Sequence, residues 1–229
     1  MRRTVISNII IISILILLVA FTNISYVTTY SSTNNLVVYH GNKQSNNASL
    51  MVNVYWGNEY IPQMLKIFKD NDIITTFFIG GTWANKYPDL LQEIANHGHE
   101  IANHGFFHKD GATLSYKDNY DEIYTTHKLV KNIINVEMNL FAPPSGSFGD
   151  NTLSACKNLS YTPIMWTYDT IDWRDQDPSL ILKRATKKIE SGNLILMHPT
   201  KATISALQNI IDAYKNEGIN ITNVSNTIK

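Results

Sequence analysis

The chain has 229 residues, 44% of them hydrophobic, which is enough for one domain with a substantial core. Nineteen Lys and Arg balance nineteen Asp and Glu, so the formal net charge is zero. Proteins that bind nucleic acids usually carry a basic surplus, so we expect no nucleic-acid partner. Cys156 is the single cysteine, which excludes a disulfide within the chain.

The N-terminal sequence is typical of an exported protein. Arg2 and Arg3 precede an apolar run over residues 5–21, which predicts an N-terminal membrane anchor or signal peptide over residues 1–22. The run is just long enough to span a bilayer, and no small-x-small cleavage site follows Ala20, so an uncleaved anchor is favoured. Residues 23–35 predict a polar tether. We expect a domain outside the cell membrane, or a protein secreted to the cell wall.

From residue 36 onwards, short apolar segments alternate with amphipathic ones. Predicted strands cover residues 36–39, 49–55, 73–79, 99–103, 162–167, 193–197 and 219–224. Predicted helices cover residues 60–70, 88–96, 115–135, 152–158, 178–190 and 204–217. Strand-helix alternation of this kind predicts a parallel α/β sheet or barrel in one domain, residues 36–229, which we expect to be a monomer.

Candidate chemical groups follow several of these strands. His104 and His108 come directly after one strand, and two imidazoles at this spacing can converge on a metal ion. Asp172 follows another strand, and His198 follows the apolar segment 193–197. Sites in α/β folds collect at the carboxyl ends of strands, so we expect these residues to lie together. A buried His-Asp pair can also be purely structural.

Five motifs occur in the order and spacing found in one known family. They are Thr76-Phe77-Phe78, Gly98–Ile101 leading into Asn103-His104 and His108, Pro143-Pro144 before Gly146, Asp169 with Asp172-Trp173, and Leu194–His198. Over residues 36–226 the chain resembles the polysaccharide deacetylases with a NodB homology domain, carbohydrate esterase family 4. Some sporulation-associated members resemble it further in having Asn-Val-x-Trp-Gly as the first motif. The resemblance implies a distorted, incomplete (β/α) barrel.

The resemblance also implies roles for individual residues. Its members hold a divalent metal, usually zinc, with an Asp and two His, and a second Asp acts as the base that activates water. A histidine of the last motif protonates the leaving amine, and the products are acetate and a free amino sugar. On this chain the matching positions are His104 and His108 as metal ligands, His198 as the acid with Asp172 orienting it, and Trp173, Pro144 and Ser145 as substrate contacts.

The chain departs from the family at the first and third motifs. Tyr55 stands where the base Asp is expected, and Trp56 stands where the metal Asp is expected. Ala142 replaces the Arg that orients the base, and Ser145 replaces an aromatic residue. Losing a general base costs about 10²–10⁴ in rate. Tyr55, Asn53 or Asp110 are the candidates for a replacement metal ligand, and Glu59 is the nearby carboxylate that is a candidate replacement for the base.

Two functions therefore remain open. One is a metal-dependent deacetylase of weak activity that acts on an extracellular amino-sugar polymer such as peptidoglycan. The other is a non-catalytic relative in the cell wall or spore envelope that binds a glycan or a protein partner through the same cleft.

Overall fold

The structure is a computed structural model that describes residues 36–229. The predicted anchor or signal peptide and the tether lie outside the described residues. Within residues 36–229, no helix combines the length and the apolar character that crossing a membrane requires. The described residues form one compact unit, Leu36–Lys229.

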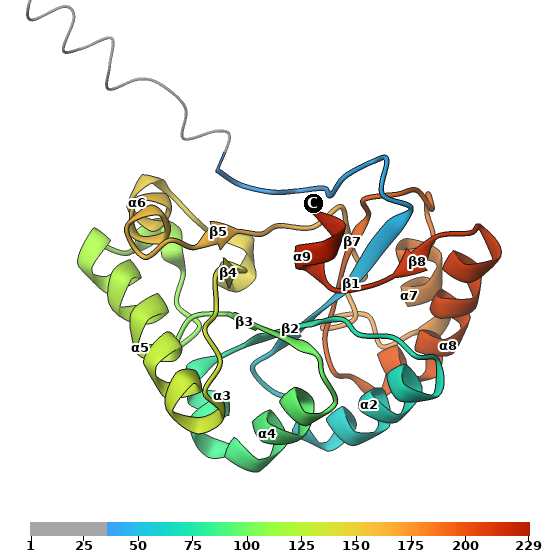
Figure 1. Cartoon of the computed structure of the whole chain (residues 1–229), viewed down its shortest axis with the longest axis horizontal. Helices are drawn as coiled ribbons and strands as arrows, with labels where there is room; N and C mark the ends of the chain where they lie inside the picture. The colour runs from blue at the N-terminus through green and yellow to red at the C-terminus, as the bar shows by residue number, and fades with distance from the viewer. Residues whose placement is uncertain (1–35) are drawn as a thin grey trace, which may run out of the picture. The chain divides into compact units, whose positions relative to one another are not determined.

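A curved sheet of parallel strands forms the centre of the domain, and helices cover its outer side (Figure 1). Hydrogen-bonded neighbours follow the order β5-β4-β3-β2-β1-β7-β6, and β8 pairs with the start of β1. Since β5 and β6 are the two ends of this order, the barrel is open between them, as the resemblance implies. The strands are β1 (Asn47–Val54), β2 (Thr76–Ile79), β3 (Glu100–Asn103), β4 (Leu140–Phe141), β5 (Thr162–Pro163), β6 (Tyr168–Asp169), β7 (Leu194–Met197) and β8 (Asn220–Ile221).

The helices alternate with the strands along the chain. They are α2 (Ile61–Asp70), α3 (Gly81–Lys86), α4 (Pro88–Asn96), α5 (Tyr116–Ile134), α6 (Asp150–Asn158), α7 (Pro178–Ala185), α8 (Lys201–Asn216) and α9 (Val224–Thr227). Short 3-10 turns occur at η1 (Asn58–Tyr60), η2 (Gly111–Thr113) and η3 (Pro144–Gly146).

Each central strand is buried on both faces because helices cover one side and the barrel interior fills the other. On β1, Leu50 and Val52 pack outwards against the helices, while Met51 points inwards. Met51 joins Phe78 of β2 and Leu194 of β7 in the interior cluster. The alternation along each strand therefore fixes which residues line the barrel and which support it.

Five segments differ from the sequence-based expectation. The predicted strand 162–167 is only β5 (Thr162–Pro163), and the separate short strand β6 follows at Tyr168–Asp169. Residues 36–39 form a single bridge between Val38 and Ile164 rather than a strand. Helix α7 ends at Ala185 instead of residue 190, and no glycine or proline marks that end in the sequence. Helix α3 was not expected. The predicted strand 219–224 is only the short β8, because the Asn223 side chain accepts the N–H of Asn226 and starts α9.

Candidate functional site

His104 and His108 lie on the loop that follows β3. His104 is 2% exposed, and its Nδ1 donates to the backbone oxygen of Ala142 at 2.7 Å, which leaves the lone pair on Nε2. The two imidazole centroids are 5.0 Å apart. Burial and the neighbouring His108 lower the pKa of His104 to about 3, and burial also lowers the pKa of His108. Both rings are therefore neutral at pH 7, the state that binds metals or hydrogen-bond donors.

A buried carboxylate holds this loop in place. Oε2 of Glu122, on α5, accepts the backbone N–H groups of Phe106 and Phe107 at 2.9 and 2.8 Å. Two residues of the loop have positive φ, Gly105 at 72° and His108 at 57°. Positive φ is uncommon for any residue with a side chain, although histidine tolerates it better than most, so support from outside the loop helps to hold the tight turn. Glu122 supplies it and thereby positions His108.

His198 follows β7 and forms a pair with Asp172. Its Nδ1 donates to Oδ1 of Asp172 at 2.8 Å, and its backbone N–H donates to Oδ2 at 2.7 Å. The hydroxyl of Thr203, at the start of α8, donates to the same Oδ2. Asp172 is fully buried, so these three donors replace the water that its carboxylate has lost. The imidazole is thus fixed with Nδ1 protonated and Nε2 turned away from the carboxylate.

Tyr55 and Trp56 occupy the end of β1, where the resemblance implies two aspartates. The Tyr55 ring lies 4.7 Å from that of His108, and its hydroxyl donates to the backbone oxygen of Phe107 at 3.3 Å. The Trp56 indole stacks on His198 with centroids 5.8 Å apart and planes 5° from parallel. Tyr55 therefore lies against His108, and Trp56 lies against His198. These are two of the three histidines on which the family's chemistry depends.

A cavity of about 430 Å³ opens where these elements meet. Its wall includes Tyr55, Trp56, both loop histidines and His198, which confirms that the strand ends gather at one place. The predicted contacts Trp173 and Ser145 also line it, and Trp173 is 53% exposed at its mouth. Asn53, Trp166, Asp169 and Leu196 complete the lining. Leu196 was not anticipated, although it precedes His198 by two residues and so shares its face of β7.

The donor set does not fit a catalytic metal with three protein ligands. Among residues 36–229, no group of three or more His, Cys, Asp or Glu is placed to hold a metal ion. His104 and His108 supply two nitrogens, while catalytic zinc sites use three protein ligands. The Tyr55 hydroxyl is directed to Phe107, and the carboxylate of Asp110 accepts the N–H of Ala112 and the hydroxyl of Ser147 instead.

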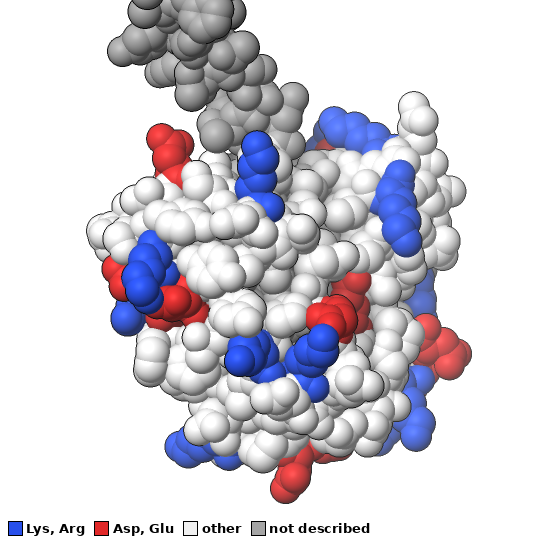
Figure 2. All heavy atoms as spheres, turned by 60° about the vertical axis from the view of Figure 1, so that its left-hand side comes forward, with Lys and Arg blue, Asp and Glu red and all other residues white. Residues whose placement is uncertain are grey.

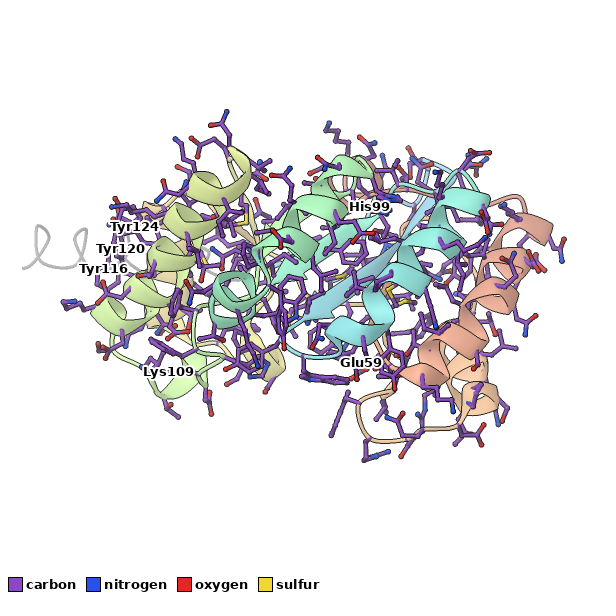
Figure 3. The ribbon with its side chains drawn as sticks, turned by 90° about the horizontal axis from the view of Figure 1, so that it is seen from below. Glu59, His99, Lys109, Tyr116, Tyr120 and Tyr124 are labelled. Atoms are coloured by element: carbon purple, nitrogen blue, oxygen red, sulfur yellow. The ribbon has the colours of Figure 1, made fainter. Side chains whose placement is uncertain are left out.

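Two further candidates lie outside the lining of the cavity. Pro144 is buried and packs against Gly105, so its role as a substrate contact stays a prediction. Glu59 is exposed on η1 and lies at the surface in Figure 3. Gly57, just before it, has φ 77°, and a Cβ there would meet the backbone oxygen of Pro199 at 2.1 Å. The absence of a Cβ lets Gly57 lie against Pro199, so the end of β1 lies next to His198.

Comparison with known proteins agrees with this geometry. The family model for polysaccharide deacetylase matches residues 40–164. The chain belongs to the polysaccharide deacetylase family. The structure is similar to that of BA3943 from Bacillus anthracis, described as a carbohydrate esterase family 4 pseudoenzyme. The two are 35% identical with a TM-score of 0.82, over 84% of this chain and 69% of that one. A BA3943 mutant described as having restored enzymatic activity is 33% identical, also with a TM-score of 0.82, over 84% of this chain and 71% of that one.

Two curated relatives are longer than the matched region. YlxY of Bacillus subtilis, named as uncharacterized, is 36% identical over 79% of this chain. A peptidoglycan-N-acetylglucosamine deacetylase of Bacillus cereus is 27% identical over 70% of this chain. The chain spans 57% and 60% of the lengths of these two relatives.

Proposed function

We propose that this protein is a non-catalytic member of the polysaccharide deacetylase family that binds an N-acetylated amino-sugar polymer, such as peptidoglycan, in its cleft. The observation that carries the proposal is the flat stack of Trp56 on His198. An indole now stands where the family's chemistry needs a metal-binding carboxylate. The similarity to a described pseudoenzyme supports the same interpretation.

The cleft keeps the features that a sugar ligand requires. Sugar rings present apolar C–H faces to aromatic side chains and hydroxyl groups to polar ones. Trp56 and Trp173 are 42% and 53% exposed, and both line the cavity. Ser145 adds a hydroxyl, and the neutral imidazole of His104 adds an acceptor. The lining therefore offers aromatic and polar partners to a sugar ring without any chemical step.

The same proposal includes a location for the domain outside the cell membrane. The apolar run over residues 5–21 behind Arg2 and Arg3 would hold the domain outside the cell membrane, where such polymers occur. A role in the cell wall or the spore envelope follows from this location. Any metal at the cleft, zinc included, would depend on His104 and His108, and Asn53, whose buried Oδ1 has no hydrogen-bond partner in the described residues, is the remaining candidate ligand.

The test is titration calorimetry of the full-length chain in detergent with N-acetylglucosamine oligomers, together with an acetate-release assay on the same oligomers. We expect binding without acetate release, and loss of binding in Trp173→Ala. Tyr39→Ala removes an equally exposed aromatic ring (51% exposed) that does not line the cavity, so this control should bind normally. Acetate release by the wild type would overturn the non-catalytic assignment.

A weak deacetylase is the second candidate, and the intact pair of Asp172 and His198 favours it. In that case acetate release should be measurable and should disappear in His198→Ala. Binding that survives His198→Ala with no acetate release from either protein would exclude this candidate.

A further inference from the structure

A row of three tyrosines runs along the outer side of α5. Tyr116, Tyr120 and Tyr124 are four residues apart, so their side chains follow one another on one face of the helix (Figure 3). Their ring centroids are 6.2 and 5.5 Å apart, with the planes tilted by 43° and 35°. Eight residues of helix make the row about 12 Å long. We call these three residues the tyrosine row.

The row is accessible and held in place. Tyr116 and Tyr124 are 37% and 40% exposed, whereas Tyr120 is partly buried against the core. The amide of Asn158 on α6 donates to the Tyr116 hydroxyl, and the Lys128 ammonium lies 5.7 Å from the Tyr124 ring centroid. These contacts fix the rings at both ends, so little side-chain entropy is lost when a ligand packs on them.

The row suits a sugar chain better than a protein or a nucleic acid. No aliphatic side chain of α5 is among the exposed large hydrophobic residues of the described chain, so the row lacks the apolar centre of a protein interface. Lys117, next to Tyr116, is already paired with Asp121. On this side of the molecule, charges of both signs are scattered between broad uncharged areas (Figure 2). Tyrosine rings with hydroxyl tips match the mixed C–H and O–H surface of an uncharged sugar.

The row begins at the same end of the molecule as the cleft. Helices that connect parallel strands run back against them, so the first turn of α5 lies at the end where the strands finish. A polar connection links the two places. Ser147, two residues after the cavity residue Ser145, donates its hydroxyl to Asp110, and the amide of Asn119 on α5 donates to the backbone oxygen of the next residue, Gly111. A chain longer than the 430 Å³ cavity can therefore continue towards the row.

We propose that the tyrosine row is a second binding site for an N-acetylated amino-sugar chain, separate from the cleft. The proposal rests on the proposed function, because the cleft is taken to hold part of the same polymer. A short oligomer would fill the cleft alone, and a long one would use both sites. Linking two sites through one ligand raises the overall affinity without any new contact in the cleft.

The test compares the N-acetylglucosamine dimer with the hexamer by titration calorimetry on the full-length chain in detergent. The double variant Tyr116→Ala/Tyr124→Ala should bind the hexamer about tenfold more weakly, as expected when exposed aromatic anchors are removed. Its affinity for the dimer should equal that of the wild type. Tyr116→Phe/Tyr124→Phe keeps the rings and should lose less, and Tyr39→Ala is the matched control at an exposed tyrosine elsewhere.

Each outcome decides the matter. Unchanged hexamer affinity in the Ala variant overturns the second site and leaves the cleft proposal standing. A wild type that binds neither oligomer overturns both proposals. A folded Ala variant, checked by circular dichroism, that loses dimer and hexamer equally overturns the separation of the two sites.

Discussion

Removing the buried carboxylate of Asp172 should destabilise the domain strongly. Asp172 is fully buried and accepts three hydrogen bonds, two from His198 and one from Thr203. Asp172→Ala leaves all three buried donors without that partner. Hydrogen bonds to a charged group contribute about 1.5–3 kcal/mol each, and part of this sum is offset by the desolvation of the carboxylate. We expect a net loss of about 3–5 kcal/mol in the free energy of unfolding.

Asp172→Asn separates the charge from the hydrogen bonds. The amide oxygen can replace Oδ2 and keep the bonds from the His198 backbone N–H and the Thr203 hydroxyl. The amide NH₂ group then faces Nδ1 of His198, so the imidazole must move its proton to Nε2. We expect a smaller loss of about 1–2 kcal/mol and a change of tautomer. Thr203→Val, which removes one of the three donors, is the matched control and should cost about 1 kcal/mol.

Urea unfolding followed by circular dichroism measures the free energies, and ¹⁵N NMR of the imidazole identifies the tautomer. A loss below about 1 kcal/mol in Asp172→Ala would refute the reasoning, because three buried donors would then be satisfied in another way. An Asn variant with its proton still on Nδ1 would show that Asp172 does not set the tautomer.

Two further predictions concern histidines. Burial lowers the pKa of His99 in the folded chain from 6.5 to about 4. The unfolded chain therefore binds a proton at a higher pH than the folded chain does. As a result, the free energy of unfolding falls as the pH drops from 6.5 to 4. Urea unfolding of the wild type should show the free energy of unfolding falling by up to about 3 kcal/mol over this pH range, and His99→Gln should remove this pH dependence. Equal pH dependence in the wild type and the variant would contradict the prediction. Trp56→Asp adds a carboxylate to the cavity that His104 and His108 also line, and calorimetry should show at least about tenfold tighter zinc binding. Unchanged affinity, or a gain that persists in Trp56→Asp/His104→Ala, would exclude a three-ligand site.

Strand ends were the most predictable part of the site. Alternating apolar and amphipathic segments require parallel strands, and parallel strands bring residues that follow β1, β3 and β7 to one edge. His104 and His198 therefore meet at the cavity although 94 residues separate them. No pairing information was needed, because the connectivity alone determines the common edge.

Local pattern could not predict contacts between side chains from distant strands. Trp56 was expected only as a lost ligand, yet it stacks on His198, which lies 142 residues further along the chain. Glu122 sits in an ordinary helical sequence, and nothing near it shows that its carboxylate holds the loop of His108. Such roles depend on the register between elements, which composition and periodicity do not encode.

The structure also explains why Asp172 and His104 can persist where Tyr55 and Trp56 replace the two aspartates that the family uses. Asp172 and His104 are 0% and 2% exposed, and each makes hydrogen bonds that the fold itself uses, so replacing either one is costly whatever the function. Trp56 lies at the rim with 42% of its surface exposed, where a change of side chain costs the fold little. His108 differs from both groups. It is only partly buried and adopts φ 57°, and its ring lies against those of Tyr55 and His104. The fold therefore uses His108 through ring packing, whereas Asp172 and His104 are held by buried hydrogen bonds.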